Sequence, residues 1–117
     1  MTKAKLIESA GKFVAVLERS QLFSAVQFEA VKKLVRDADQ AGKIIGVICH
    51  AGWVPISAGI MNGRRATGST AIKDDIENAG GIWVDAAAFR DGNLVWGRVV
   101  EDIPDFCREL VAAIEGG

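Results

Sequence analysis

The apolar run at residues 44–48 constrains this chain more than any other feature, because it ends abruptly in Cys49 and His50. Its Ile- and Val-rich composition is typical of a strand that is buried on both faces of a parallel sheet. A glycine and a helical pattern follow at once. Parallel sheets gather their functional groups where a strand ends and the next helix begins. The sequence therefore predicts a strand-to-helix turn, with Cys49 as the first candidate functional residue.

Helical and strand patterns alternate along most of the chain and predict an α/β domain. Apolar side chains recur at helical spacing from Ser24 to Ala41, and Gly42 is a suitable C-terminal cap. Residues 3–17 stay ambiguous, because they suit an amphipathic helix and 13–17 equally suits a buried strand. Further helices are expected at 53–61, 69–79 and 102–114, short strands at 82–84, 87–89 and 94–96, and a hairpin turn at 91–93.

Composition excludes several classes of function. The 117 residues fit one domain, 1–117, and the formal net charge of −1 with interspersed charges argues against a nucleic-acid partner. No apolar run approaches the roughly 18 residues that span a bilayer, and the first residues lack the order of a secretory signal. We therefore expect no membrane partner and a cytoplasmic location. One histidine and two cysteines without zinc-type spacing argue against a metal site.

Seven short motifs carry a resemblance to a known family. They lie in order at Ile48–His50, Ile56–Gly59, Gly63–Thr67, Ile72–Gly80, Trp83–Asp85, Asp91–Leu94 and Asp102–Cys107. With these motifs the chain resembles the C-terminal half of the ThiJ/PfpI superfamily, and most of all its PfpI-type branch. The resemblance covers 28–117, whereas 1–27 have no counterpart. It implies a flavodoxin-like parallel sheet sandwiched by helices, truncated at the N-terminal side and carrying a small hairpin.

The resemblance also implies an activity. Family members of this type include proteases, deglycases and glyoxalase-type enzymes, which need no organic cofactor and act on the carbonyl groups of small molecules or peptides. By similarity, Cys49 is the catalytic nucleophile and His50 the base beside it. Glu18 is the candidate for the glutamate that faces the cysteine in the family. A cysteine at a helix N-terminus is favoured as the reactive thiolate, and a neighbouring imidazole can carry a proton near neutral pH.

The shortened architecture leaves two questions open. Without the first strand of the family, one apolar edge of the sheet is expected to be uncovered, and such an edge invites pairing. Either the segment at 13–17 pairs as a substitute strand, or the chain assembles as a homo-oligomer or with an N-terminal partner fragment. The resemblance agrees with assembly, since family members commonly form dimers and hexamers. The alternative to an enzyme is a non-catalytic, truncated family member that acts as a redox-sensing or interaction domain through oxidation of Cys49.

Overall fold

A computed structural model describes residues 25–116 of the chain. The chain divides into two compact units, Met1–Val31 and Lys32–Gly117, and the first of the described helices, α2 (Ala25–Gln40), includes the residues at which they divide. Its end agrees with the prediction, because Gly42 has a φ of +70° and the chain turns there toward the first strand. The elements that concern the candidate site belong to the second unit, which is described below by itself.

The second unit contains two small sheets. The larger has the order β1–β5–β4, in which β1 (Ile45–Ile48) is parallel to β5 (Leu94–Gly97), and β5 forms a hairpin with β4 (Ala88–Asp91). The smaller joins β2 (Arg65–Ala66) and β3 (Ile82–Trp83) in parallel. The predicted α/β class with a small hairpin is thus confirmed.

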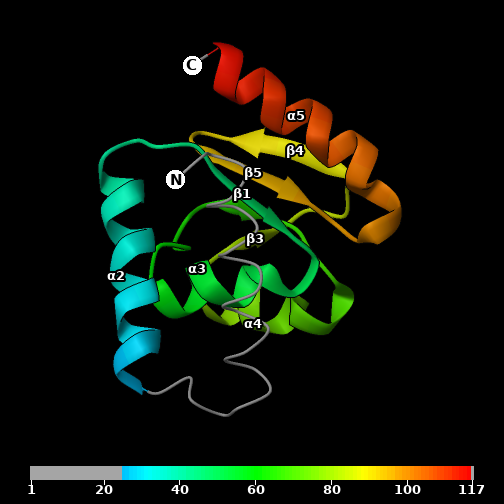
Figure 1. Ribbon diagram of the computed structural model, residues 1–117. Helices are drawn as coiled ribbons and strands as arrows, with labels where there is room; N and C mark the ends of the chain where they lie inside the picture. Colours follow the sequence, from blue (N-terminus) through cyan, green and yellow to red (C-terminus); the bar gives the residue numbers. More distant parts are fainter. Residues whose placement is uncertain (1–24, 117) are drawn as a thin grey trace. The chain divides into compact units, whose positions relative to one another are not determined.

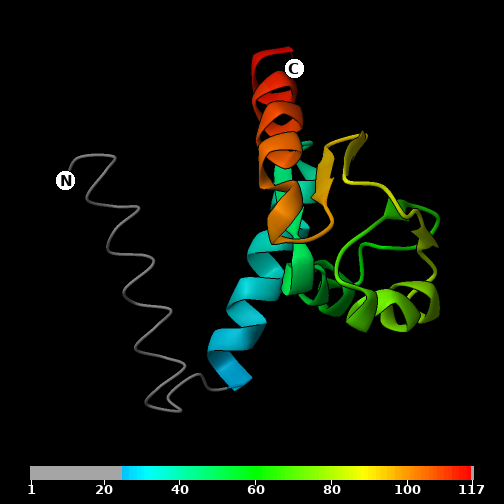
Figure 2. The same ribbon diagram turned by 90° about the vertical axis from the view of Figure 1, so that its right-hand side faces the viewer.

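Helices lie on both sides of these strands. α5 (Ile103–Gly116) runs along one side of the hairpin, and α3 (Trp53–Ala58) and α4 (Lys73–Asn78) lie on the other (Figure 1). The view turned by 90° separates the layers, with the hairpin between α5 and the group formed by α4, β2 and β3 (Figure 2). No helix among residues 25–116 is long and apolar enough to cross a membrane.

The hydrophobic core lies between β1, β5 and the α3–α4 layer. Trp96, Leu94, Ile72 and Ile76 are completely buried, and Met61 is 1% exposed. On the other face of the sheet, α5 approaches β5 so closely that a Cβ atom on Gly97 would lie 2.9 Å from Phe106. A glycine at this position is therefore what allows the helix to pack against the strand.

Two expectations about individual elements need correction. The helix expected at 69–79 is shorter, because a 3-10 turn at Thr70–Ile72, capped by the Ser69 hydroxyl, precedes α4. β1 is not buried on both faces: it is an edge strand among the described residues, with Val47 buried and Gly46 exposed. The unpaired edge of β1 among the described residues agrees with the expectation for a shortened sheet. It also explains why the apolar pattern overestimated the burial of β1.

A polar network links the segments that surround the sheet. The Arg64 guanidinium donates to Asp39 at 2.8 Å, and Asn93 donates both to Asp39 and to the Lys43 carbonyl. Burial alone would raise the pKa of Asp39, but the hydrogen bonds from Arg64 and Asn93 outweigh it and the pKa is lowered. The carboxylate therefore stays ionised and ties α2 to the hairpin turn.

Candidate active site

The backbone makes its sharpest turn at Cys49. Ile48 is still extended, with φ −132° and ψ 144°, whereas Cys49 has a φ of 59° and opens the 3-10 helix η1 (Cys49–Gly52), which continues into α3. A non-glycine residue in this left-handed region costs on the order of 1–3 kcal/mol, and such strain is concentrated at functional sites. The turn predicted from the apolar run is thus present, and it holds the Cys49 side chain at the carboxyl end of β1.

The segment that follows β2 packs against the turn at Cys49. The Ser69 N–H donates to the Cys49 carbonyl at 3.4 Å. A Cβ atom on Gly68 would lie 2.6 Å from the same carbonyl oxygen, so only glycine lets the two backbones approach this closely. Gly52, at the end of η1, lies similarly close to Ile72. The strained conformation at Cys49 is therefore fixed by contacts from a distant part of the sequence.

The structure brings Cys49 and His50 into direct contact. The Cys49 Sγ lies 3.2 Å from Nδ1 of His50, within hydrogen-bonding distance for sulfur. Cys49 is half-buried, and His50 is exposed. The thiol can therefore donate to a neutral imidazole, and a thiolate can accept from an imidazolium. This is the geometry that a nucleophile and its base require.

Trp53 contacts the His50 ring and in turn bonds to Asp75. The ring centroids of His50 and Trp53 are 5.3 Å apart, with 57° between the planes. Nε1 of Trp53 donates at 2.9 Å to Oδ2 of Asp75, which belongs to the first turn of α4. The bond between Trp53 and Asp75 was not anticipated from the sequence, although Trp53 follows His50 at helical spacing.

Arg98 lies at the same end of the sheet, but its guanidinium already bonds to two carboxylates. Arg98 follows β5, whose Gly97 pairs with Ile48, so it lies beside the turn that carries Cys49. Its guanidinium donates to Asp85 at 2.9 Å and to Asp102 at 3.0 Å. The hydrogen bond from Arg98 lowers the pKa of Asp102. Both carboxylates neutralise the guanidinium, which argues against a role in binding a substrate anion.

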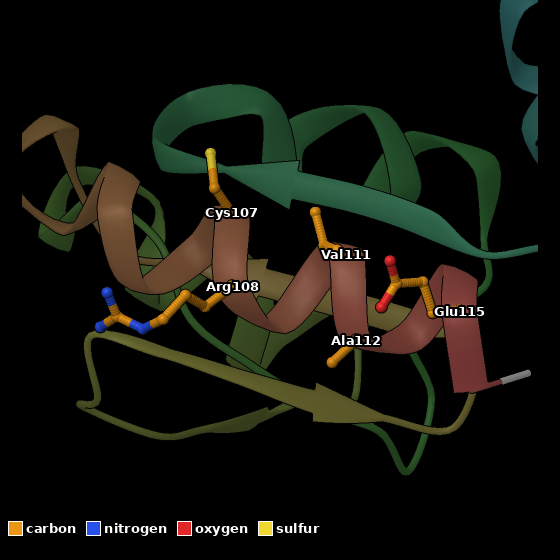
Figure 3. A pocket seen from close by; sticks show the side chains of 5 residues that line it. All are labelled: Cys107, Arg108, Val111, Ala112 and Glu115. Atoms are coloured by element: carbon orange, nitrogen blue, oxygen red, sulfur yellow. The ribbon is translucent and has the colours of Figure 1, made fainter.

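Glu18, the third site residue expected from the sequence, falls outside the described residues. Cys107 is exposed on α5, at a hollow of about 500 Å³ that Arg108, Val111, Ala112 and Glu115 also line (Figure 3). A second hollow, of about 220 Å³, lies beside β1 and is lined by Val35, Ile45, Gly46, Val47, Ala51, Val54 and Pro55. Neither hollow has Cys49 or His50 among its described lining residues.

Fold and site together define a flavodoxin-like α/β protein with adjacent cysteine and histidine side chains at the carboxyl end of a parallel strand. The chain belongs to the DJ-1/PfpI family, which matches residues 23–113. The resemblance to the ThiJ/PfpI superfamily is thereby confirmed.

Several relatives are known as deglycases. A deglycase of Pyrococcus horikoshii is 40% identical over 87 residues, which cover 74% of this chain and 52% of that protein. The deglycase PfpI of Pyrococcus furiosus is 36% identical, again over 74% of this chain and 52% of its own length. The chain thus spans about half the length of the curated relatives it matches.

Solved structures show the same fold. The DJ-1/ThiJ/PfpI-like and ferritin-like two-domain protein of Anabaena variabilis superposes with a TM-score of 0.70 at 32% identity, over 72% of this chain and 24% of that one. A DJ-1 superfamily protein of Salmonella typhimurium gives a TM-score of 0.61 at 34% identity, over 70% of this chain and 44% of that one.

Proposed function

We propose that this chain is a cysteine-dependent hydrolase of the protease, deglycase or glyoxalase kind, with Cys49 as its nucleophile. The observation that carries the proposal is the 3.2 Å contact between Cys49 Sγ and His50 Nδ1 at the end of β1. Support for the class comes from the relatives named deglycases, which are 36% to 42% identical to this chain over the matched segments. The site of action we propose is the cytoplasm.

The proposed chemistry uses both side chains. His50 takes the thiol proton, and the Cys49 sulfur forms a bond to a substrate carbonyl carbon while the C=O π electrons move to oxygen. Where the carbonyl carries an amine, the imidazolium gives its proton to the departing amine and water then hydrolyses the acyl–sulfur bond. Where the carbonyl is the aldehyde of a 2-oxoaldehyde, the alkoxide takes the proton, a proton shift from C1 to C2 turns the hemithioacetal into a 2-hydroxyacyl thioester, and water hydrolyses this thioester. The substrate is a small molecule or a peptide that offers an electrophilic carbonyl. No step requires a metal or an organic cofactor.

The test measures reactivity and turnover separately. A Cys107→Ser chain keeps Cys49 as its only thiol, since the sequence has two cysteines. We expect this chain to react with iodoacetamide faster than a free thiol at neutral pH, and to hydrolyse at least one of a glycated amine, a 2-oxoaldehyde and a peptide ester. Cys49→Ser removes both properties, and Glu18→Gln tests the carboxylate expected from the sequence.

Two results would count against the proposal. An alkylation profile with a midpoint near pH ~8.5, as for an ordinary thiol, would remove the argument for an activated nucleophile. Fast alkylation without turnover of any substrate would instead favour the alternative function, a redox-sensing or interaction domain in which Cys49 is oxidised.

A further inference from the structure

We propose that Trp53 is a positioning residue for His50 and that Asp75 acts on the imidazole through Trp53, by fixing the indole ring. The proposal deepens the proposed function and rests on it, because it explains how an exposed histidine keeps its orientation toward Cys49. It concerns a bond between two helices that the pattern of the sequence does not reveal.

The orientation of the His50 side chain depends on what restricts its rotation. His50 lies in η1 with an exposed side chain, and an exposed side chain on one turn of helix ordinarily samples several rotamers. Only some of these rotamers point Nδ1 at the thiol. Because proton transfer requires the 3.2 Å approach to Cys49, some group must restrict the ring.

Trp53 is placed to impose that restriction. It lies three residues after His50, on the same face of a helical turn, and its ring centroid is 5.3 Å from that of the imidazole. The tilted arrangement, at 57°, falls within the range that aromatic pairs prefer. The indole thus lies against the imidazole and restricts its rotation, and it can also stabilise the imidazolium that forms during proton transfer.

Trp53 itself needs an anchor, because it is 47% exposed. The anchor is the hydrogen bond from its Nε1 to the Asp75 carboxylate at 2.9 Å. An ionised acceptor makes this bond stronger than one between neutral groups. Asp75 stands on α4, so the bond ties the start of α3 to a separate helix and selects one orientation of the indole.

The neighbouring carboxylate provides a matched control. Asp74 occupies the same first turn of α4 and carries the same charge, and it is also exposed. An effect of Asp75 that came only from the charge near the N-terminus of α4 would be shared by Asp74. An effect that passes through Trp53 would belong to Asp75 alone.

The experiment compares Asp75→Ala, Asp75→Asn, Trp53→Phe and Asp74→Ala in the full chain carrying Cys107→Ser. The first readout is the rate of iodoacetamide alkylation of Cys49 at pH 7. The second is the proton NMR spectrum of the imidazole, which is unambiguous because His50 is the only histidine of the chain. The indole ring current shifts the His50 ring protons only while the two rings keep a fixed arrangement.

We expect Asp75→Ala and Trp53→Phe to slow alkylation about tenfold and to move the His50 signals toward their positions in a disordered chain. Asp75→Asn, whose amide oxygen still accepts from the indole, restores most of the rate and of the ring-current shift. Asp74→Ala behaves as the parent chain. Near-UV circular dichroism of each variant checks that the fold is kept.

Wild-type alkylation and unchanged His50 signals in a folded Asp75→Ala chain would overturn the proposal, as would an equal effect of Asp74→Ala. This outcome is distinct from failure of the proposed function, which shows as absence of turnover. His50 signals that depend on Asp75 support the positioning role even in a chain that turns over none of the substrates.

Discussion

At Cys49 the side chain that we propose for catalysis stands on a backbone with a φ of 59°. The strain arises from the Cβ atom, so glycine relieves it and alanine does not. We expect the free energy of unfolding of Cys49→Gly to exceed that of Cys49→Ala by about 1 kcal/mol. Urea denaturation of the two variants measures the difference.

Ala51→Gly, two residues further along η1, is the control for the general effect of glycine on the unfolded chain. We expect it to be less stable than the parent, because Ala51 lies within the 3-10 turn and gains nothing from a left-handed conformation. Equal stability of Cys49→Gly and Cys49→Ala would show that the turn carries no strain at this position.

Sequence reasoning reached the pair Cys49–His50 because the two residues are adjacent and follow a recognisable strand. It did not reach the bond between Trp53 and Asp75, which lie on different helices. The contact depends on how α3 and α4 pack, and no local pattern records that packing. Glu18 falls outside the described residues, and its role stays a prediction.

An ion pair between Arg98 and Asp102 lies in the connection between β5 and α5. The Asp102 carboxylate accepts from Arg98 and from the Val99 N–H, and the bond from Arg98 holds its pKa below the ordinary value. A carboxyl group with a lowered pKa stabilises the fold above its unfolded pKa, about 3.9, and loses that contribution as the pH falls through the folded pKa. Acid should therefore weaken the start of α5.

We predict that the difference in unfolding free energy between the parent chain and Asp102→Asn narrows as the pH falls from about 5 to about 2. Urea denaturation at several pH values measures it. The same comparison in an Arg98→Gln background is the control, and there the dependence on pH should be weaker. A difference that stays constant with pH would mean that the carboxylate is not stabilised by its partner.

Elements with a strong local signal were predicted correctly in kind. The hairpin was recognisable from its Asp-Gly-Asn turn, and α5 from Pro104 in its first turn and an apolar face. The burial of β1 was overestimated from the sequence. An apolar run shows that the side chains of a strand can be buried, but it does not show whether another strand or helix covers them. The single domain expected over 1–117 stays a prediction.

At the scale of the whole molecule, apolar surface remains uncovered on the described residues. Val111 is 51% and Ile114 63% exposed on α5, and β1 has an unpaired edge. We propose that copies of this chain associate through α5, as the expected homo-oligomer. Light scattering should then give a mass above the 12.5 kDa of one chain at micromolar concentration.

Ile114→Glu is expected to reduce the measured mass to that of one chain, because association would bury the new charge. Ala112→Glu is the control: Ala112 lies two residues before Ile114, about 200° away around the helix axis, and association should survive a charge there. A well-folded parent chain that remains monomeric at these concentrations would contradict the proposal.

The pairing of β1 with β5 also sets an order of events during folding. Residues 49–93 separate the two strands, whereas β4 and β5 are joined by a short turn and can pair early. β1 can pair with β5 only after the two ends of the long segment between them have come together, which costs chain entropy. We therefore expect the turn at Cys49 to form late, so that a nascent chain carries no organised thiol site until the rest of this unit is assembled.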